Sequence, residues 1–451
     1  MSCTFEQYFE SLKGKRIAVF GLGVSNRPLV RLLLEFGCDV TGCDKTPREN
    51  LEEEVLELER MGCKLSVGEH YLDDLEAELV FRTPGMHPGI SALEALRAKG
   101  AEVTSEMEVF FEVCPCSILA ITGSDGKTTT TTLVSEILKA AGKAVWVGGN
   151  IGTPLLPRVR EMKETDYCVV ELSSFQLMDM KRSPHIAVVT NLAPNHLDVH
   201  KDMQEYVDAK KNIFNFQNAG DILIINADNA ITAPFVGNGI TKAFSYQGKD
   251  AAVKLEGSTI TRNGVPVLDK KDILLPGEHN VENYMAAIAA VEGLVEDEVI
   301  RQVARTFGGV EHRIELVRVK DGVRYYNDSI ASSPSRTIAG LRSFPEKVIL
   351  IAGGYDKHIP YDVLGPEICA HVKKLFLCGA TAPQIRMAVE NCTGEKPEMV
   401  DCGKFEHAVK AAAAAAESGD VVLMSPASAS FDEFKNFMVR GNFFKKLIME
   451  L

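Results

Sequence analysis

The sequence has no apolar run as long as the roughly 18 to 20 residues of a membrane span, so we expect none. Its first residues, MSCTFEQYFESLKGKR, include acidic side chains and no apolar core, which argues against a signal peptide. Acidic residues outnumber basic ones by 62 to 49, and the net charge is −13. Such a chain lacks the clustered positive charge that binds a nucleic-acid backbone. These absences predict a protein with no membrane span and no nucleic-acid partner.

Metal-binding and disulfide-forming cysteine patterns are also missing. The 11 cysteines are scattered and none forms a CxxC pair; the nearest spacing is Cys114-Pro115-Cys116. This usage predicts a reduced, cytoplasmic protein with buried thiols. No Ser/Gly-rich linker and no repeat is present, and the alanine run 411–416 is simply a strong helix former.

Short apolar runs that alternate with helical patterns are what the sequence does have. RIAVFGLG (16–23) and KVILIAGG (347–354) are two of many such runs. Nearly continuous apolar runs are typical of buried parallel strands, and their alternation with helices predicts an α/β fold. A chain of 451 residues is too long for one core. We predict three domains, at residues 1–104, 105–309 and 310–451.

Residues 117–132, SILAITGSDGKTTTTT, predict a phosphate-binding loop. An apolar strand leads into a turn with two glycines, and a helical pattern begins at Lys127. The full Walker pattern would place a glycine where Ile121 stands. Even so, the backbone N–H groups of such a loop and the helix N-terminus face an anion. We expect Lys127 to neutralise the outer phosphates of a nucleotide and the Thr128 hydroxyl to hold Mg²⁺.

A second glycine turn, GLGVSN (21–26), follows the first apolar run, and Asp44 ends the next one. The pattern is close to the dinucleotide fingerprint, in which such an acid binds a ribose hydroxyl. Asn26 stands in place of the third glycine. Three interpretations stay open: a nicotinamide site, a Rossmann-like domain for another nucleotide-bearing molecule, which we favour, and a purely structural turn.

A phosphoryl-transfer site also needs metal ligands, usually carboxylates at the ends of neighbouring strands. Glu171 closes the apolar run YCVVE, where solvation gives no reason for a charge, and this favours a metal role. His196, Asp198 and His200 form an HxDxH spacing that occurs in metal hydrolases, but no further Cys/His cluster completes a zinc set. Lys210 alone predicts only a solvated lysine on a helix.

Taken together, these stretches resemble the Mur ligases, the ATP-dependent amide-forming enzymes of peptidoglycan synthesis. The resemblance covers essentially the whole chain, through TGSDGKT, GGNIG, the Glu171 strand, NHLD, GEHN, EHR, YNDSIA and SPASASFDEFKNF. ELSSFQL and SPASASFDEFKNFMVRGNFF are similar to the member that adds D-glutamate. The DNPR motif usual in the diaminopimelate-adding member is absent, and folylpolyglutamate synthases are similar only in their last two domains.

The resemblance implies a Rossmann-like N-terminal domain, a P-loop ATPase-like central domain and a Rossmann-like C-terminal domain that closes over ATP. It implies a monomeric ligase that joins D-glutamate to UDP-N-acetylmuramoyl-L-alanine through an acyl phosphate and a tetrahedral intermediate. ADP and phosphate would be released, and two Mg²⁺ ions would assist. The alternatives are a nicotinamide-dependent oxidoreductase and a non-catalytic nucleotide-binding regulator, which the many separate polar loops disfavour.

The resemblance assigns roles to the residues of this chain that match the family's motifs. The catalytic residues would be Lys127, His196 and Lys210. ATP would be bound by Gly123, Ser124, Asp125, Gly126, Lys127, Thr128, Thr129, Asn283, Arg313 and Asp328. The metal ligands would be Thr128, Glu171, His196 and Lys210. The family carbamylates the lysine that matches Lys210, which turns a repelled cation into an anionic ligand.

The resemblance also implies which residues contact the amino-acid and sugar-nucleotide substrates. The sugar nucleotide would contact Asn150 and, around uracil, Val24, Ser25 and Asp44, whereas D-glutamate would contact Lys357, Ser430 and Phe437. The chain departs from the family at Ile330, where many relatives carry lysine, and at the substrate-binding position Ser332, where they carry threonine. The base that deprotonates the amine is not identified, since a metal-bound His196 is poorly free to act.

Overall fold

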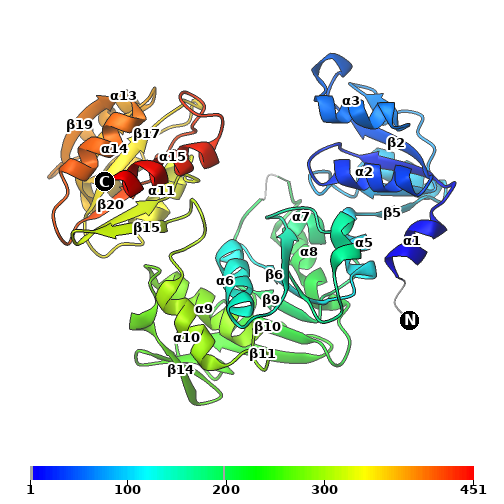
Figure 1. Cartoon of the computed structure of the whole chain (residues 1–451), viewed down its shortest axis with the longest axis horizontal. Coiled ribbons are helices and arrows are strands. Elements are labelled where there is room, and N and C mark those ends of the chain that lie inside the picture. Colours follow the sequence, from blue (N-terminus) through cyan, green and yellow to red (C-terminus); the bar gives the residue numbers. More distant parts are fainter. Residues whose placement is uncertain (1–3, 197–198) are drawn as a thin grey trace. The chain divides into compact units, whose positions relative to one another are not determined.

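The computed structural model of the protein describes residues 4–196 and 199–451. Three sheets organise these residues, and helices flank them (Figure 1). The chain divides into two compact units: residues up to Lys270 with Glu282–Val303, and Lys271–Val281 with Ala304–Leu451. In the part of the chain that is described, no helix is both long and apolar enough to cross a membrane. The domain limits at residues 104 and 309 stay predictions.

The N-terminal sheet has five parallel strands in the order β3-β2-β1-β4-β5. Four of the five residues of β1 are buried, as the apolar run predicts. The strands are β1 (Arg16–Phe20), β2 (Asp39–Asp44), β3 (Lys64–Val67), β4 (Leu79–Arg82) and β5 (Glu102–Thr104). The helices are α1 (Phe5–Ser11), α2 (Asn26–Glu35), η1 (Arg48–Asn50), α3 (Glu53–Arg60) and α4 (Ser91–Ala98).

The central sheet has nine strands in the order β14-β13-β12-β11-β10-β9-β6-β8-β7. Neighbouring strands are parallel from β7 to β12 in this order, and only the pairs β12–β13 and β13–β14 at one edge are antiparallel. The strands are β6 (Ser117–Thr122), β7 (Val145–Gly149), β8 (Tyr167–Glu171), β9 (Ile186–Val189), β10 (Ile222–Asn226), β11 (Ile240–Ser245), β12 (Val253–Glu256), β13 (Thr259–Arg262) and β14 (Val265–Asp269).

The helices between the first and the last sheet follow the predicted alternation. They are α5 (Glu106–Val113), α6 (Lys127–Ala140), η2 (Leu156–Glu161), α7 (Ser174–Leu177), α8 (Met203–Asn215), η3 (Lys270–Asp272), α9 (Glu278–Ala290) and α10 (Asp297–Thr306). Because β6 lies between β8 and β9, the segments that follow these three strands meet at one edge of the sheet. This edge is where parallel sheets bind ligands.

The last sheet has the order β15-β16-β20-β17-β18-β19, parallel except for the pair β15–β16. Every residue of β17 is buried, as its apolar run predicts. The strands are β15 (Glu315–Lys320), β16 (Val323–Asn327), β17 (Val348–Gly353), β18 (Val372–Cys378), β19 (Glu398–Gly403) and β20 (Val421–Met424). The helices are α11 (Pro334–Leu341), α12 (Leu364–His371), α13 (Ala382–Glu390), α14 (Phe405–Ala414) and α15 (Phe437–Glu450). The three mainly parallel sheets confirm the predicted α/β class.

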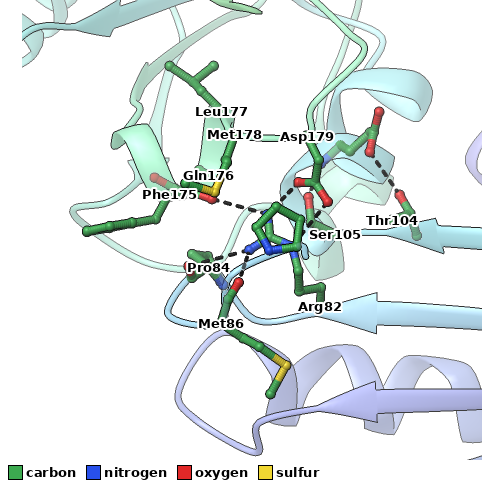
Figure 2. Close-up of polar contacts among 12 residues, drawn as sticks. Arg82, Pro84, Met86, Thr104, Ser105, Phe175, Gln176, Leu177, Met178 and Asp179 are labelled. Carbon is green, nitrogen blue, oxygen red and sulfur yellow. Dashed lines mark hydrogen bonds and ion pairs between the residues drawn. The ribbon is translucent and has the colours of Figure 1, made fainter. Parts of the chain in front are cut away.

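Within the first unit, Arg82 joins the end of β4 to the segment that follows β8 (Figure 2). The side chain is buried, and its Nη1 donates to Met86 O at 2.6 Å. Nη2 donates to Phe175 O at 3.1 Å, and the guanidinium pairs with the Asp179 carboxylate. A buried guanidinium is tolerated because it is paired and hydrogen-bonded. Arg82 therefore fixes α7, which comes directly after the segment that carries Glu171.

Candidate active site

The predicted phosphate loop forms a tight turn between β6 and α6. Gly126, the N-cap residue of α6, has φ +76°, a left-handed conformation that side chains rarely adopt. A Cβ atom on Gly126 would collide with Asn283 Oδ1, and one on Gly123 would collide with Thr190 Oγ1. Thr130 Oγ1 also donates to Asn283 Oδ1, at 3.2 Å. The structure thus brings Asn283 against the loop, although about 150 residues separate the two in sequence.

Lys127 begins α6 and folds over the loop. Its Nζ donates to Ser124 O at 2.8 Å and to Gly123 O at 3.0 Å. The Ser124 hydroxyl lies 2.9 Å from Tyr206 Oη and donates to Ala193 O at 3.0 Å. These bonds hold the ammonium group at the mouth of the loop, where it can meet the phosphates of a nucleotide. Asp125 is exposed at the tip of the loop, and Thr128 and Thr129 are half-buried in the first turn of α6.

Glu171 ends β8 beside the loop and is 2% exposed. Its Oε1 accepts a hydrogen bond from Asn150 Nδ2 at 2.9 Å. Its Oε2 is buried and has no hydrogen-bond partner among the described residues. Burying a charged oxygen without a partner is costly, so a free carboxylate oxygen here fits a cation. Asn150, predicted as a sugar-nucleotide contact, orients this carboxylate.

Lys210 lies on α8 and is also 2% exposed. Its Nζ donates to Thr122 Oγ1 at 3.0 Å, and it lies 5.1 Å from the centre of the Tyr206 ring. Burial lowers the pKa of Lys210 well below its ordinary value of 10.5; the Lys127 charge lowers it further, and the Glu171 charge opposes the shift. Three predicted site residues, Lys127, Glu171 and Lys210, therefore form one electrostatic cluster.

His196 lies in the loop after β9 and is exposed. Its φ of +56° is unusual for a residue with a side chain, and its ring centre lies 5.0 Å from that of Phe175. His200 is buried instead, and its Nε2 lies 2.9 Å from Ser174 Oγ. Asp198 lies outside the described residues. The two histidines of the HxDxH spacing thus have different surroundings: His196 is exposed, whereas the His200 ring is buried and hydrogen-bonded to Ser174.

The GLGVSN turn lies beside a hollow of about 980 Å³ in the N-terminal sheet region. Gly21, Asp44, Thr83 and His87 are among the residues that line it. Although burial opposes the shift, hydrogen bonds from Leu22 N and from Thr46 lower the pKa of Asp44. The hollow lies at the carboxyl ends of β1, β2 and β4, the end of a parallel sheet at which ligands bind.

Asn26 explains how this turn forms without the third glycine of the fingerprint. Its Nδ2 donates to Gly21 O at 2.8 Å and to Phe20 O at 3.2 Å, so the side chain holds the turn closed. Val24 and Ser25, both predicted contacts, are exposed on the turn. Asn26 therefore has a structural role that a glycine could not fill.

In the second unit, Asp328 follows β16 and is buried. Its Oδ2 accepts from Ser425 Oγ at 2.7 Å, and its Oδ1 accepts from Ile314 N at 3.3 Å. Burial raises the pKa of Asp328 to about 7, although these hydrogen bonds and nearby arginines oppose the shift. Arg313, next to this cluster in the chain, is exposed.

Two predicted substrate-binding residues, Lys357 and Ser332, lie together in this unit. Lys357 Nζ donates to Ser332 Oγ at 3.5 Å from an exposed position. Ser430 is buried in the loop after β20, and Phe437 begins α15. Arg336 Nη1 donates to Ile330 O at 3.2 Å, which puts a guanidinium beside the position where many relatives carry lysine.

A family model described as "Mur ligase middle domain" matches residues 121–291, and another, "Mur ligase, glutamate ligase domain", matches residues 312–428. The UDP-N-acetylmuramoylalanine–D-glutamate ligase of Acetivibrio thermocellus is 51% identical over 461 aligned residues, which cover 99% of each chain. The chain belongs to the Mur ligase family. This membership confirms the resemblance that the motifs predict.

Solved structures of other Mur ligases share the fold. The UDP-N-acetylmuramate–alanine ligase of Thermotoga maritima superposes with a TM-score of 0.58 at 18% identity, over 97% of this chain and 99% of that chain. The MurF ligase of Thermotoga maritima, solved in complex with ADP, gives a TM-score of 0.55 at 16% identity, over 98% and 97%. Mur ligases this distant in sequence therefore keep the same architecture.

Two parts of the site have no signal in the sequence. Thr122 is the hydrogen-bond partner of Lys210, and Tyr206 links the Lys210 surroundings to Ser124. In the sequence, both are typical of ordinary residues in a buried strand and a helix. Only the spacing of Tyr206, one helical turn before Lys210, could have suggested that the two share a helix face.

Proposed function

We propose that this Mur ligase uses ATP to join D-glutamate to UDP-N-acetylmuramoyl-L-alanine. The observation that supports it most is the cluster of Lys127, Glu171 and Lys210 at the phosphate loop. A cationic loop residue beside a buried carboxylate with a free oxygen suits phosphoryl transfer, in which charge on the moving group must be offset. The names of relatives such as the Acetivibrio thermocellus ligase support the choice of substrates.

ATP binding is assigned to the loop and to Asn283, Arg313 and Asp328. Residues 123–129 surround the phosphates, toward which the N-terminus of α6 is directed, Lys127 offsets their charge, and Asn283 contacts the adenine. Arg313 and Asp328 contact phosphate and ribose. The close packing of Asn283 against Gly126 supports its assignment, since this side chain already borders the loop.

Metal binding is assigned to Thr128, Glu171, His196 and Lys210. When bound, Mg²⁺ offsets the negative charge on the phosphates of ATP. The free Glu171 Oε2 supports a ligand role for this carboxylate. His196 is exposed at the same edge of the sheet and can turn toward a ligand.

Lys210 is assigned a carbamate. Nζ of the neutral amine attacks the carbon of CO₂, a proton leaves, and an anionic group replaces the ammonium. The reaction needs the neutral amine, and burial favours that form of Lys210. Thr122, which now accepts a hydrogen bond from Nζ, has a hydroxyl that could donate to the carbamate instead.

The reaction proceeds in two bond-forming steps. A carboxylate oxygen of the L-alanyl end attacks the γ-phosphorus of ATP, and the bond to the β–γ bridging oxygen breaks, which releases ADP and leaves an acyl phosphate. The amine nitrogen of D-glutamate then attacks the carbonyl carbon. The tetrahedral intermediate expels phosphate, and the nitrogen loses a proton as the amide forms. Phosphorylation is needed because a carboxylate has only oxide to lose.

The substrates are assigned to the two outer parts of the chain. The sugar nucleotide occupies the hollow beside Asp44, with Val24, Ser25 and Asn150 as further contacts. D-glutamate contacts Lys357, Ser430 and Phe437, where the Lys357 ammonium attracts a carboxylate, and Ser332 is a further substrate-binding residue. We further propose that residues 1–104, 105–309 and 310–451 are the domains and that the enzyme acts as a cytoplasmic monomer.

The test is phosphate release from ATP in the presence of UDP-N-acetylmuramoyl-L-alanine and one of three amino acids. We expect release with D-glutamate and little with L-glutamate or diaminopimelate. Release that does not depend on the amino acid supplied would contradict the proposed ligation. Fluorescence titration with NADH provides a separate control, because saturable binding would favour an oxidoreductase.

A further inference from the structure

Three cysteines meet at the end of the central sheet opposite the phosphate loop. Cys114 follows the last residue of α5, Cys116 precedes β6, and Cys168 is the second residue of β8. Their sulfur atoms all lie within 4.8 Å of one another, and Cys114 Sγ and Cys168 Sγ are 3.6 Å apart. No other group of three or more His, Cys, Asp or Glu side chains in residues 4–196 and 199–451 has this geometry.

These separations are those of sulfur ligands around one metal ion. With metal–sulfur bonds of about 2.3 Å, ligands in a tetrahedral or trigonal site lie about 3.8 to 4.0 Å from one another. The observed sulfur atoms therefore need to move by less than an ångström or so to enclose an ion. Cys116 and Cys168 are buried and Cys114 is half-buried, so an ion can enter from the Cys114 side.

The donor set decides the class of metal. Met162 Sδ, the further sulfur nearby, lies 3.8 Å from Cys168 Sγ. The adjacent carboxylate of Asp166 already accepts hydrogen bonds from Trp146 Nε1 and Lys163 N. Thiolates with a thioether select Cu(I), and thiolates with a water molecule in an open fourth position suit Zn(II). Hard cations such as Mg²⁺ prefer oxygen and do not suit this set.

We propose that Cys114, Cys116 and Cys168 bind one thiophilic metal ion with a filled d shell, Cu(I) or Zn(II), at a site separate from the nucleotide site. The thiols release protons as the ion binds. β6 continues from Cys116 to the phosphate loop, and at about 3.3 Å per residue its far end is on the order of 20 Å away. The ion therefore acts on stability and contacts no reacting group.

The site ties together segments that are distant in sequence. Cys114 and Cys168 are 54 positions apart, and the ion joins the end of α5 to the starts of β6 and β8. A ligand that binds the folded but not the unfolded chain raises stability by mass action. We expect the apparent melting temperature to rise with metal concentration.

The sole tryptophan of the chain gives a direct readout. Trp146 lies on β7 and its Cα is the register partner of Cys168, and its indole is bound to Asp166. The experiment uses the full-length protein, fully reduced and metal-free under argon. It is titrated with Cu(I) buffered by a competing chelator and, separately, with Zn(II). We expect a saturable change in Trp146 fluorescence at one equivalent, with a higher melting temperature, for at least one of the two ions.

Variants distinguish this site from other thiols. Cys116→Ala and the milder Cys114→Ser, at a half-buried position, are expected to weaken binding by more than about tenfold. Cys378→Ala is the matched control, because Cys378 is a buried strand cysteine outside the cluster, and it is expected to bind like the wild type. Circular dichroism checks that each variant is folded.

Three results would overturn the proposal. The first is reduced wild-type protein that binds neither ion. The second is binding of wild-type strength in both Cys116→Ala and Cys114→Ser. The third is a Cys114–Cys168 disulfide, found by mass spectrometry, in protein that takes up no metal after reduction.

Discussion

Two buried carboxylates at strand ends, Glu171 in the central sheet and Asp328 in the last sheet, have contrasting surroundings. Asp328 has hydrogen bonds to both oxygens, and burial raises its pKa to about 7. Glu171 has one oxygen bound to Asn150 and the other free, in the same electrostatic cluster as Lys127 and the buried amine of Lys210. Asp328 is thus hydrogen-bonded within the protein at both oxygens, whereas the free oxygen of Glu171 supports the proposed cation site.

The largest effect is expected from Lys127→Ala in the central cluster. Loss of the loop ammonium leaves the phosphoryl charge without this partner, and we expect kcat to fall by roughly 10²–10³-fold or more. Lys139→Ala is the matched control, since Lys139 is on the same helix and pairs on the surface with Glu136. Phosphate release measures both variants. Unchanged kcat in Lys127→Ala would contradict the assignment of the loop.

Lys210→Met separates activity from stability in the same cluster. The pKa of Lys210 in the folded protein is below its ordinary value of 10.5. Between the folded pKa and 10.5 the unfolded chain therefore binds more protons than the folded one, and the stability of the fold rises with pH over this range. In CO₂-free buffer at pH 7, replacing this amine by an apolar side chain of similar length should raise the apparent melting temperature by a few degrees. Activity should be lost.

The pH dependence of stability in Lys210→Met tests whether this amine causes the rise. The rise in stability between neutral and alkaline pH should be smaller in the variant than in the wild type. Bicarbonate should increase wild-type activity and leave the variant inactive. A variant that is both active and unaltered in stability would show that Lys210 is neither buried nor used as described.

Asp328→Asn tests the carboxylate that is hydrogen-bonded at both oxygens, and it should have a milder effect on stability. Its folded pKa of about 7 lies above its ordinary 3.8, so the folded state binds more protons between these values and stability falls as pH rises through this range. Asparagine stays neutral, and the fall should be reduced. Urea unfolding at pH 5 and pH 7.5 measures the difference. An equal loss of stability in the wild type and the variant would show that other groups cause the pH dependence.

The smallest effect is expected from Arg336→Ala beside Ile330. If this guanidinium supplies the positive charge that many relatives place on a lysine, its loss should raise the KM of a substrate a few-fold with little change in kcat. Ile330→Lys in the Arg336→Ala background should restore the KM. No change in either variant would show that the charge at this position is not used.

The α/β class and the turn between β6 and α6 could be predicted from the sequence because both depend on local patterns. β17 appears as a continuous apolar run, and α6 begins at Lys127, where its pattern begins. The Lys210 site could not be derived in this way. Its burial depends on β6 and α8 meeting in space, and an isolated lysine on a helix is typical of a solvated face.

Asn26 and the cysteine cluster show the same limit. A missing glycine reads as a weakened fingerprint until the Asn26 amide is seen bound to Gly21 O. Cys168 lies far from Cys114 and Cys116 in sequence, so no spacing rule connects it to them. The pairing of β6 with β8 brings them together, and that pairing is a property of the sheet.

The proposed acyl phosphate can be tested directly by following an oxygen atom. UDP-N-acetylmuramoyl-L-alanine is prepared with both carboxylate oxygens labelled with ¹⁸O and is converted in the presence of ATP and D-glutamate. Mass spectrometry of the released phosphate should find one ¹⁸O atom per molecule, because the attacking carboxylate oxygen leaves with the phosphoryl group. Unlabelled phosphate released together with amide product would contradict an acyl phosphate at this site.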